Sequence, residues 1–312
     1  MKKPELLLVG PMMPHVMAAM ESDYIVHRLW EAEDREETLD RVAGQIRAIG
    51  TGGRSGADAA LMDRLPNLEI IASFGVGVDT IDVEHAHDRG IIVTNTPDVL
   101  NDEVANMALA LLLATTRRLV AGDRFVREGK WRDGPMPLEH GLRGTRLGIL
   151  GLGRIGKDFA RKAGLFGMEI VYNGRREQPD QPYRFMPDLV EMAAACDHLV
   201  VLCPGGPSTD NLVGRAVLDA LGPEGTLINV ARGTVVDEPE LVAALVEKRL
   251  GAAGLDVFAD EPHVPEALLA LDNVVLQPHK ASATIETRHA MGDLVIENLR
   301  AHFAGRRAVT PV

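Results

Sequence analysis

The chain of 312 residues has few cysteines, few aromatic residues and a shortage of positive charge. Its two cysteines, Cys196 and Cys203, form no C-x-x-C pair, so neither a disulfide scaffold nor a zinc site is indicated. With 33 basic against 45 acidic residues, the formal net charge of −12 argues against a general binder of nucleic acid or anionic membranes. An anionic ligand therefore requires a local basic site.

Long hydrophobic runs are also missing. The apolar run at 104–116 is shorter than a membrane span, and the run near the N-terminus is too short for a signal peptide. A hydrophobic content of 46% is typical of a globular protein, and the length suffices for two domains with separate cores. We expect a reducing, cytoplasmic setting, with neither nucleic acid nor membrane as a partner.

Strand and helix patterns alternate along the chain. In the first hundred residues, strands are expected at 5–9, 24–29, 46–50, 68–73 and 91–93, with helices at 13–20, 35–43 and 56–65. A second series has strands at 146–150, 168–172, 198–202, 226–230, 251–256 and 274–276. Such alternation predicts an α/β protein with two doubly wound parallel sheets, each covered by helices on both faces.

Two long helical patterns connect these series. The pattern at 103–119 is interpreted as a crossing between domains, and the pattern at 283–303 would return the chain to the first domain. We therefore predict a dinucleotide-binding domain at 100–283, inserted into a discontinuous substrate domain formed by 1–99 and 284–312.

The stretch 147–156 combines an apolar strand, a glycine turn and the start of a helix. Its three glycines have the G-x-G-x-x-G spacing of a dinucleotide site, and the apolar segment 168–172 completes the βαβ arrangement that this motif requires. The first glycine allows the turn, the second lets the backbone approach a pyrophosphate, and the third lets the helix pack on the strand. The helix N-terminus then offers free N–H groups to the phosphates. The expected cofactor contacts here are Gly151, Gly153, Arg154, Ile155 and Gly156.

The loop after the next strand bears on the choice of cofactor. An NAD site has an acidic residue about twenty positions beyond the glycines, which binds the ribose 2′-OH. Here the loop contains Asn173, Arg175 and Arg176, and the first carboxylate follows at Glu177. Because two guanidinium groups suit a 2′-phosphate, we expect NADP(H) to be preferred over NAD(H). Asn173, Arg175 and Arg176 are expected to contact the cofactor.

Another glycine turn, formed by Gly75, Val76 and Gly77, directly follows an expected strand. Its backbone N–H groups could meet a substrate carboxylate, although an ordinary turn is the simpler interpretation of these residues alone. Further along, Trp131 lies in an expected loop, where it is either a packed surface aromatic or part of a subunit contact or substrate wall.

Three later motifs resemble the D-isomer-specific 2-hydroxyacid dehydrogenases in order and spacing: 229–233 (NVARG), 256–262 (DVFADEP) and 277–284 (QPHKASAT). The turn at 75–77 and the segment 96–98 (TPD) match as well, so the resemblance covers nearly the whole chain. Within the family, the chain looks closest to NADP-type glyoxylate/hydroxypyruvate and hydroxyphenylpyruvate reductases. The resemblance implies a Rossmann cofactor domain inserted into a flavodoxin-like substrate domain.

The resemblance also implies how individual residues act. Reduction of a 2-keto acid needs a hydride from the nicotinamide and a proton for the carbonyl oxygen. His279 matches the family's acid/base and Glu261 its partner carboxylate. Arg232 matches the arginine that holds the substrate carboxylate and polarises the carbonyl. The substrate would contact Val76, Gly77, Leu100, Arg232 and Lys280.

Further residues are implied along the cofactor. Asp256 matches the family residue near the nicotinamide carboxamide, and Cys203 and Pro204 follow the strand expected beneath the cofactor. The other implied contacts are Thr209, Val230, Ala231, His279 and Ala281. One departure is Lys280, because the residue after the catalytic histidine is often apolar in the family. This cation is either solvated, or it attracts an anionic substrate or a cofactor phosphate. No metal site is expected.

We therefore predict an NADPH-dependent reductase that converts a small 2-keto acid, such as glyoxylate or hydroxypyruvate, to the D-2-hydroxy acid. Phenylpyruvate and 2-ketogluconate are bulkier alternative substrates, while formate-like or phosphite-like hydride donors are not favoured by the arginine loop. A binding module is a second class of function, because dinucleotide-sensing corepressors share this fold. The complete set of Arg232, Glu261 and His279 favours an enzyme. Since the family commonly dimerises through the cofactor domain, a homodimer is expected.

Overall fold

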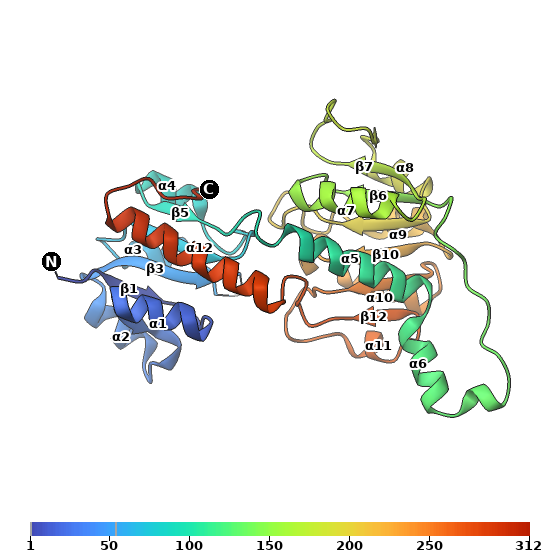
Figure 1. Ribbon diagram of the computed structural model, residues 1–312, viewed down its shortest axis with the longest axis horizontal. Helices are drawn as coiled ribbons and strands as arrows, with labels where there is room; N and C mark the ends of the chain where they lie inside the picture. The colour runs from blue at the N-terminus through green and yellow to red at the C-terminus, as the bar shows by residue number, and fades with distance from the viewer. Residues whose placement is uncertain (1, 54) are drawn as a thin grey trace. The chain divides into compact units, whose positions relative to one another are not determined.

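The computed structural model describes residues 2–53 and 55–312. The chain forms two compact units: unit 1 contains the residues up to Leu100 and from Ala283 onward, and unit 2 is Asn101–Ser282 (Figure 1). Each unit is built on one sheet, of five and of seven strands, and every strand pair in both sheets is parallel. The predicted α/β fold class with two parallel sheets is confirmed.

The sheet of unit 1 has the strand order β2-β1-β3-β4-β5. Its strands are β1 (Glu5–Leu8), β2 (Ile25–Arg28), β3 (Ile46–Gly52), β4 (Ile70–Phe74) and β5 (Ile92–Thr94). The helices of this unit are α1 (Pro14–Asp23), the 3₁₀ turn η1 (Leu29–Glu31), α2 (Arg35–Val42), α3 (Ala59–Asp63), α4 (Val83–Asp88) and α12 (Ile285–Phe303). The last helix of the chain therefore completes the first unit.

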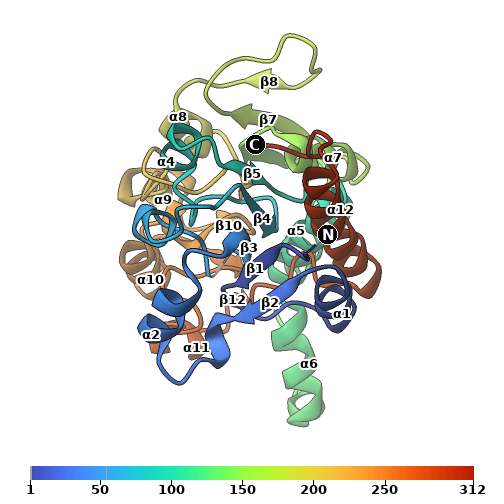
Figure 2. The same ribbon diagram turned by 90° about the vertical axis from the view of Figure 1, so that its left-hand side faces the viewer.

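The side-chain alternation of β1 explains why helices cover both faces of this sheet. Leu6 and Leu8 pack with residues of α1 and α12, whereas Leu7 packs with residues of α2, α3 and α4. Figure 2 shows α1 and α12 on one side of the sheet and α2 on the other. All three leucines are fully buried, and each such side chain contributes roughly 1.5–3 kcal/mol through the hydrophobic effect.

The sheet of unit 2 has the order β12-β11-β10-β9-β6-β7-β8. Its strands are β6 (Arg146–Leu150), β7 (Glu169–Asn173), β8 (Arg184–Phe185), β9 (His198–Val201), β10 (Thr226–Asn229), β11 (Ala252–Leu255) and β12 (Val274–Leu276). The helical segments are α5 (Asn101–Thr116), α6 (Leu119–Arg127), η2 (Lys130–Arg132), α7 (Arg154–Gly164), α8 (Leu189–Ala194), α9 (Arg215–Leu221), η3 (Gly233–Val235), α10 (Glu238–Val246) and α11 (Glu266–Leu269).

Helices again cover both faces of this second sheet. Residues of α8, α9, α10 and α11 form one core with the strands, and α5 and α7 lie on the opposite face (Figure 1). At Gly254 of β11, an added Cβ would lie 2.8 Å from Thr115 Oγ1 and 3.2 Å from Leu111 Cβ, because α5 rests directly on the strand. The strand order reverses between β6 and β9, which is where α/β sheets of this kind bind ligands.

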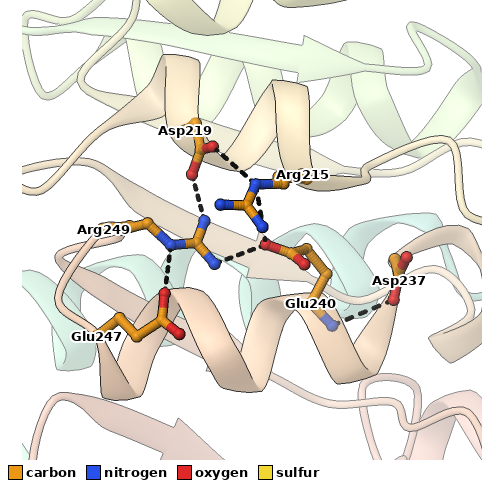
Figure 3. Close-up of polar contacts among 6 residues, drawn as sticks. All are labelled: Arg215, Asp219, Asp237, Glu240, Glu247 and Arg249. Atoms are coloured by element: carbon orange, nitrogen blue, oxygen red, sulfur yellow. Dashed lines mark hydrogen bonds and ion pairs between the residues drawn. The ribbon is translucent and has the colours of Figure 1, made fainter.

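An ion-pair cluster ties α9 and α10 together on their face of the sheet (Figure 3). Arg249 contacts Glu240 at 2.6 Å, Glu247 at 2.7 Å and also Asp219, while Arg215 lies 3.4 Å from the Asp219 carboxylate. An isolated ion pair at the surface adds little to the stability of the fold. A guanidinium bound by three carboxylates forms a network, which stabilises the fold more than an isolated pair does. The cluster fixes α10, whose first residue contacts the candidate site.

The structure differs from the sequence prediction at several elements, and α4 lies where no helix was predicted. The helix expected at 103–119 begins at Asn101 and ends at Thr116, after which Arg118 adopts a left-handed conformation (φ 44°) and α6 begins. In the described part of the chain, no single helix is long and apolar enough to cross a membrane; α5 and α6 reach that length and composition together, with a 55° bend between them. The two-residue β8 was also missed, because a strand this short carries no pattern.

Candidate active site

The predicted site residues of unit 2 lie along one edge of its sheet, beyond the carboxyl ends of six neighbouring strands. In the order of the strands, His279 follows β12, Asp256 follows β11, Arg232 follows β10, Cys203 follows β9, Gly151 follows β6 and Arg175 follows β7. Ligands of open parallel sheets bind in the crevice at this edge. Residues up to 128 positions apart in the sequence therefore line one edge, because the strands are parallel.

The three glycines of the turn are required for different reasons. Gly151 has φ 101°, and an added Cβ would lie 2.6 Å from the backbone nitrogen of Cys203 at the end of β9. A Cβ on Gly156 would overlap the Gly151 carbonyl oxygen. At Gly153, by contrast, no described atom lies within 4 Å of a Cβ position. The first and third glycines thus allow close backbone packing, and the second leaves room for a ligand.

The N-terminus of α7 fits the pyrophosphate of a dinucleotide. Gly153 is its N-cap residue, and among the residues that the structure describes no side chain caps the helix. Its first turn also contains no acidic residue. The N–H groups of Ile155 and Gly156 in this turn, at the positive end of the helix dipole, can meet phosphate oxygens.

The loop after β7 presents Arg175 and Arg176, the arginine pair, to solvent. Neither guanidinium has a hydrogen bond or ion pair with any described residue. Asn173, in contrast, is buried, and its amide nitrogen donates to the carbonyls of Met186 (2.8 Å) and Pro187 (3.0 Å). The arginine pair is therefore available to an anion, whereas the amide of Asn173 holds the two ends of the loop together. Its predicted contact with the cofactor stays a prediction.

The imidazole of His279 and the carboxylate of Glu261 are in contact. His279 Nδ1 lies 2.8 Å from Glu261 Oε2, and Glu261 Oε1 accepts a 3.3 Å hydrogen bond from the N–H of Phe258. The Glu261 side chain is 16% exposed and that of His279 is 33% exposed. A carboxylate at Nδ1 favours the tautomer with hydrogen on that nitrogen, so Nε2 is the ring atom left for a substrate.

Asp256 fixes the backbone that carries His279. Its carboxylate is fully buried and accepts hydrogen bonds from the N–H groups of Lys280 (2.8 Å) and Ala281 (2.9 Å). Its carbonyl accepts from the His279 N–H at 2.7 Å, and His279 adopts φ 49°. Burial raises the pKa of the Asp256 carboxyl, while the two N–H donors act in the opposite direction. The contact with nicotinamide that the family resemblance implies for Asp256 stays a prediction, and this clamp was not predicted.

The segment with Arg232 is shaped by Asn229, the last residue of β10. The Asn229 side chain accepts from the Ala231 N–H at 3.0 Å and donates to the Arg232 carbonyl at 2.9 Å. It therefore turns the chain directly after the strand. Asn229 belongs to the NVARG motif, and its place in that motif is the sequence signal for this turn.

Two contacts bring the Arg232 segment against the segment that carries Glu261. An added Cβ on Gly233 would overlap the carbonyl group of Phe258, so the two backbones touch and a side chain is excluded. Glu238, the first residue of α10, accepts a hydrogen bond from the Ala259 N–H at 3.0 Å. The order of the motifs along the chain did not reveal either contact.

The other predicted cofactor residues surround the same edge. Cys203 is buried, and burial raises the pKa of its thiol to about 11, so the thiol is not suited to act as a nucleophile, and its predicted contact with the cofactor stays a prediction. Thr209 Oγ1 lies 2.8 Å from the Pro204 carbonyl within the loop after β9. Val230, Ala231 and Ala281 are buried, while Pro204 and Lys280 are exposed. The part of Lys280 in binding stays a prediction.

Unit 1 holds the remaining predicted residues. The turn after β4 is fixed from behind: Gly75 exchanges two hydrogen bonds with Thr96, and Asn95 Nδ2 donates to the Val76 carbonyl at 2.8 Å. No described residue accepts from the N–H groups of Val76 or Gly77. These two donors suit a carboxylate. Leu100, at the end of unit 1, is buried.

Comparison with known proteins identifies the family. Residues 109–281 match the family described as "D-isomer specific 2-hydroxyacid dehydrogenase, NAD binding domain". The chain is 47% identical to a hydroxyphenylpyruvate reductase of Plectranthus scutellarioides, over 98% of each chain. It is 44% identical to a 2-ketogluconate reductase of Gluconobacter oxydans, over 99% of this chain and 99% of the relative.

Solved structures agree with this result. An NADPH-dependent glyoxylate/hydroxypyruvate reductase from Sinorhizobium meliloti, in complex with NADP and malonate, is similar with a TM-score of 0.94 and 45% identity. The match covers 100% of this chain and 97% of that one. Motifs, fold and relatives lead to one conclusion: the chain belongs to the D-isomer-specific 2-hydroxyacid dehydrogenase family.

Proposed function

We propose that this protein reduces a 2-keto acid to the D-2-hydroxy acid with NADPH, with Arg232, Glu261 and His279 as its catalytic residues. As a member of its family it is an oxidoreductase with a nicotinamide dinucleotide as cofactor. The observation that carries the proposal is the 2.8 Å contact between His279 Nδ1 and Glu261 Oε2. It lies on the sheet edge that also presents Arg232 and the glycine turn.

The geometry assigns a part to each catalytic side chain. When bound, the reduced nicotinamide supplies a hydride to the carbonyl carbon of the substrate. His279 donates a proton from Nε2 to the carbonyl oxygen, while Glu261 stabilises the charged ring through Nδ1 and fixes its orientation. Arg232 pairs with the substrate carboxylate and stabilises the negative charge that develops on the carbonyl oxygen.

We assign cofactor binding and substrate binding to two different domains of the chain. Residues 100–283 would bind the cofactor, and residues 1–99 with 284–312 would bind the substrate. In the latter, the N–H groups of Val76 and Gly77 would hold the carboxylate, with Leu100 as an apolar neighbour. Lys280 would lie beside the substrate or a cofactor phosphate.

The preference for NADPH rests on the arginine pair, because two exposed guanidinium groups occupy the place where an NAD site has an acidic residue. The Sinorhizobium meliloti relative, whose structure holds NADP, is consistent with this proposal. Glyoxylate or hydroxypyruvate is the proposed substrate. Phenylpyruvate-like acids and 2-ketogluconate are the bulkier candidates, supported by the names of two relatives.

The test is oxidation of NADPH, followed by absorbance with NADH in parallel, against glyoxylate, hydroxypyruvate, phenylpyruvate and 2-ketogluconate. We expect turnover with at least one of these acids, and a clearly higher kcat/KM with NADPH than with NADH. A preference for NADH would contradict the part given to the arginine pair and leave the catalytic set intact. Cofactor binding without turnover of any of these acids would instead favour a dinucleotide-sensing module.

We further propose that the protein is a homodimer joined through unit 2. None of the residues of α6 is buried, and the segment from α6 to residue 138 presents several large apolar side chains to solvent. Trp131 is 68% and Leu138 98% exposed, and apolar surface of this kind marks a contact site. Light scattering should give twice the 33.7 kDa mass of the chain. A Trp131→Ser/Leu138→Ser double variant should shift the mass toward the monomer, and a monomeric wild type would contradict the proposal.

The cysteines fit a reducing, cytoplasmic setting, which we propose for the protein. Cys196 and Cys203 are both free and buried, and burial raises the pKa of the Cys196 thiol to about 12. Neither thiol is suited to oxidation or disulfide exchange.

A further inference from the structure

The arginine pair lies in the short segment 173–178, here called the bridge, whose two ends are hydrogen-bonded to the glycine turn. At the start of the bridge, the Asn173 carbonyl accepts a hydrogen bond from the Gly151 N–H at 2.9 Å. At its end, Gln178 Nε2 donates to the Leu152 carbonyl at 2.8 Å. Since Gly151 and Leu152 are consecutive, both ends of the bridge are attached to the turn that precedes α7.

Gln178 is itself attached to the core of unit 2. Its backbone N–H donates to Tyr172 Oη at 2.7 Å. Tyr172 is 1% exposed, and its ring packs against that of Phe185 with 5.3 Å between the centroids. Gln178 thus joins three parts of the unit: the buried end of β7, the glycine turn and the exposed loop.

The two attachments restrict where the guanidinium groups can go. Four residues, Gly174 to Glu177, separate Asn173 from Gln178, so the arginine pair cannot move far from the turn while both hydrogen bonds hold. A preorganised loop loses less conformational entropy when a ligand binds than a free loop does. The spacing between the N-terminus of α7 and the arginine pair is therefore set before a dinucleotide arrives.

We infer that Gln178 is a positioning residue for cofactor selection, which holds the arginine pair where the 2′-phosphate of NADPH lies when the pyrophosphate is at the glycine turn. The inference rests on the proposed preference for NADPH and deepens it. Gln178 acts through the arginines and touches no reacting atom. Its removal should affect binding of the 2′-phosphate and leave proton transfer at His279 unchanged.

The variant Gln178→Met keeps the length of the side chain and removes its donor. Loss of one neutral hydrogen bond predicts a decrease of about 3-fold to 10-fold in affinity for a 2′-phosphorylated ligand. Gln181→Met is the matched control, because Gln181 lies in the same exposed loop and its amide donates to the neighbouring Asp180 at 2.7 Å. This control should keep wild-type affinity.

The first measurement is calorimetric binding of two fragments, adenosine 2′,5′-bisphosphate and adenosine 5′-monophosphate, which requires no turnover. Gln178→Met should weaken binding of the bisphosphate and leave that of the monophosphate unchanged. Steady-state kinetics should then show a higher KM for NADPH, the same KM for NADH and an unchanged kcat. In an Arg175→Ala/Arg176→Ala background, Gln178→Met should have no further effect on the ratio of the two fragment affinities.

The outcomes of these measurements distinguish the inference about Gln178 from the proposed preference for NADPH. If the wild type binds both fragments equally, the preference for NADPH and the part of Gln178 fail together. If the wild type prefers the bisphosphate and Gln178→Met keeps that preference, the inference about Gln178 alone is wrong. Should Gln178→Met not fold, Tyr172→Phe removes the hydroxyl that holds the Gln178 N–H and must lower the same preference. An unchanged preference in that variant overturns the inference.

Discussion

The two ends of the candidate ligand-binding edge of unit 2 are held in different ways. At the reaction end, the segments 229–233, 256–262 and 277–281 are fixed by a buried carboxylate, by touching backbones and by the His279–Glu261 contact. At the arginine end, the segment 173–178 leaves both guanidinium groups exposed, and its attachments are hydrogen bonds to the glycine turn and Tyr172.

We relate this difference to the functions proposed for the two ends, proton transfer at one and recognition of a 2′-phosphate at the other. Proton transfer requires a fixed distance and angle, and a misplacement of about 1 Å can lower a rate by about 100-fold. Recognition of a 2′-phosphate requires charge at the correct place and tolerates small movements of long side chains. We therefore expect substitutions at the reaction end to lower kcat, and substitutions at the arginine end to raise KM for NADPH.

The largest expected effect is at His279. The variant His279→Gln keeps a polar side chain and removes the acid, so kcat should fall by about 10²–10⁴-fold with little change in KM for NADPH. The matched control is His263→Gln, because the His263 side chain is 78% exposed. A kcat within a few-fold of the wild type would contradict the assignment of His279 as the proton donor.

Asp256→Asn tests whether the reaction end depends on its backbone clamp. An amide can accept from one of the two N–H groups, but its own NH₂ faces the other, so the loop with His279 should shift. We expect kcat to fall on the order of 10–100-fold. Asp260→Asn, at an exposed neighbouring position, is the control. Steady-state kinetics that show a selective rise in KM for NADPH, with kcat retained, would place Asp256 in cofactor selection instead.

The arginine end is tested by the double variant Arg175→Ala/Arg176→Ala. Loss of charge-assisted hydrogen bonds of about 1.5–3 kcal/mol should raise KM for NADPH by about 10-fold to 100-fold. KM for NADH and kcat should stay near their wild-type values, and the exposed Arg184→Ala serves as control. An equal rise in KM for both cofactors would show that the pair attracts any dinucleotide and does not read the 2′-phosphate.

The smallest effect is expected away from this edge. His198, at the amino end of β9, is 7% exposed, and in the described part of the chain neither ring nitrogen has a hydrogen-bond partner. Burial lowers the pKa of His198. Below about pH 6.5 the imidazole of His198 therefore binds a proton in the unfolded chain but not in the folded chain. The free energy of unfolding thus decreases as the pH is lowered, until the pH reaches the lowered pKa of the folded state.

Urea denaturation from pH 7 to pH 5 measures this dependence. His198→Leu should reduce the loss of stability, by up to about 1.4 kcal/mol for each pH unit in that window, without changing kcat or KM. His140→Leu, at an exposed position, is the control. If the slope of stability against pH stays the same in His198→Leu, the acid sensitivity has another source.

The sequence was sufficient for the fold class, because each parallel strand buried on both faces leaves an apolar run between two helical patterns. The catalytic set could be proposed because His279, Glu261 and Arg232 lie in motifs that resemble those of the family in order and spacing. What holds these residues was not predictable in the same way. The clamp of Asp256 depends on backbone N–H groups 24 and 25 residues away, and Gln178 lies in an irregular loop with no periodicity. α6 was missed because the break at Arg118 carries no glycine or proline signal.

Transfer of deuterium from NADPH labelled at C4 of the nicotinamide to glyoxylate tests the central claim most directly. We expect mass spectrometry to find deuterium at C2 of the product glycolate, and this product to be lost in His279→Gln. Oxidation of the labelled cofactor without deuterium in the hydroxy acid, or equal product formation by the variant, would contradict the claim.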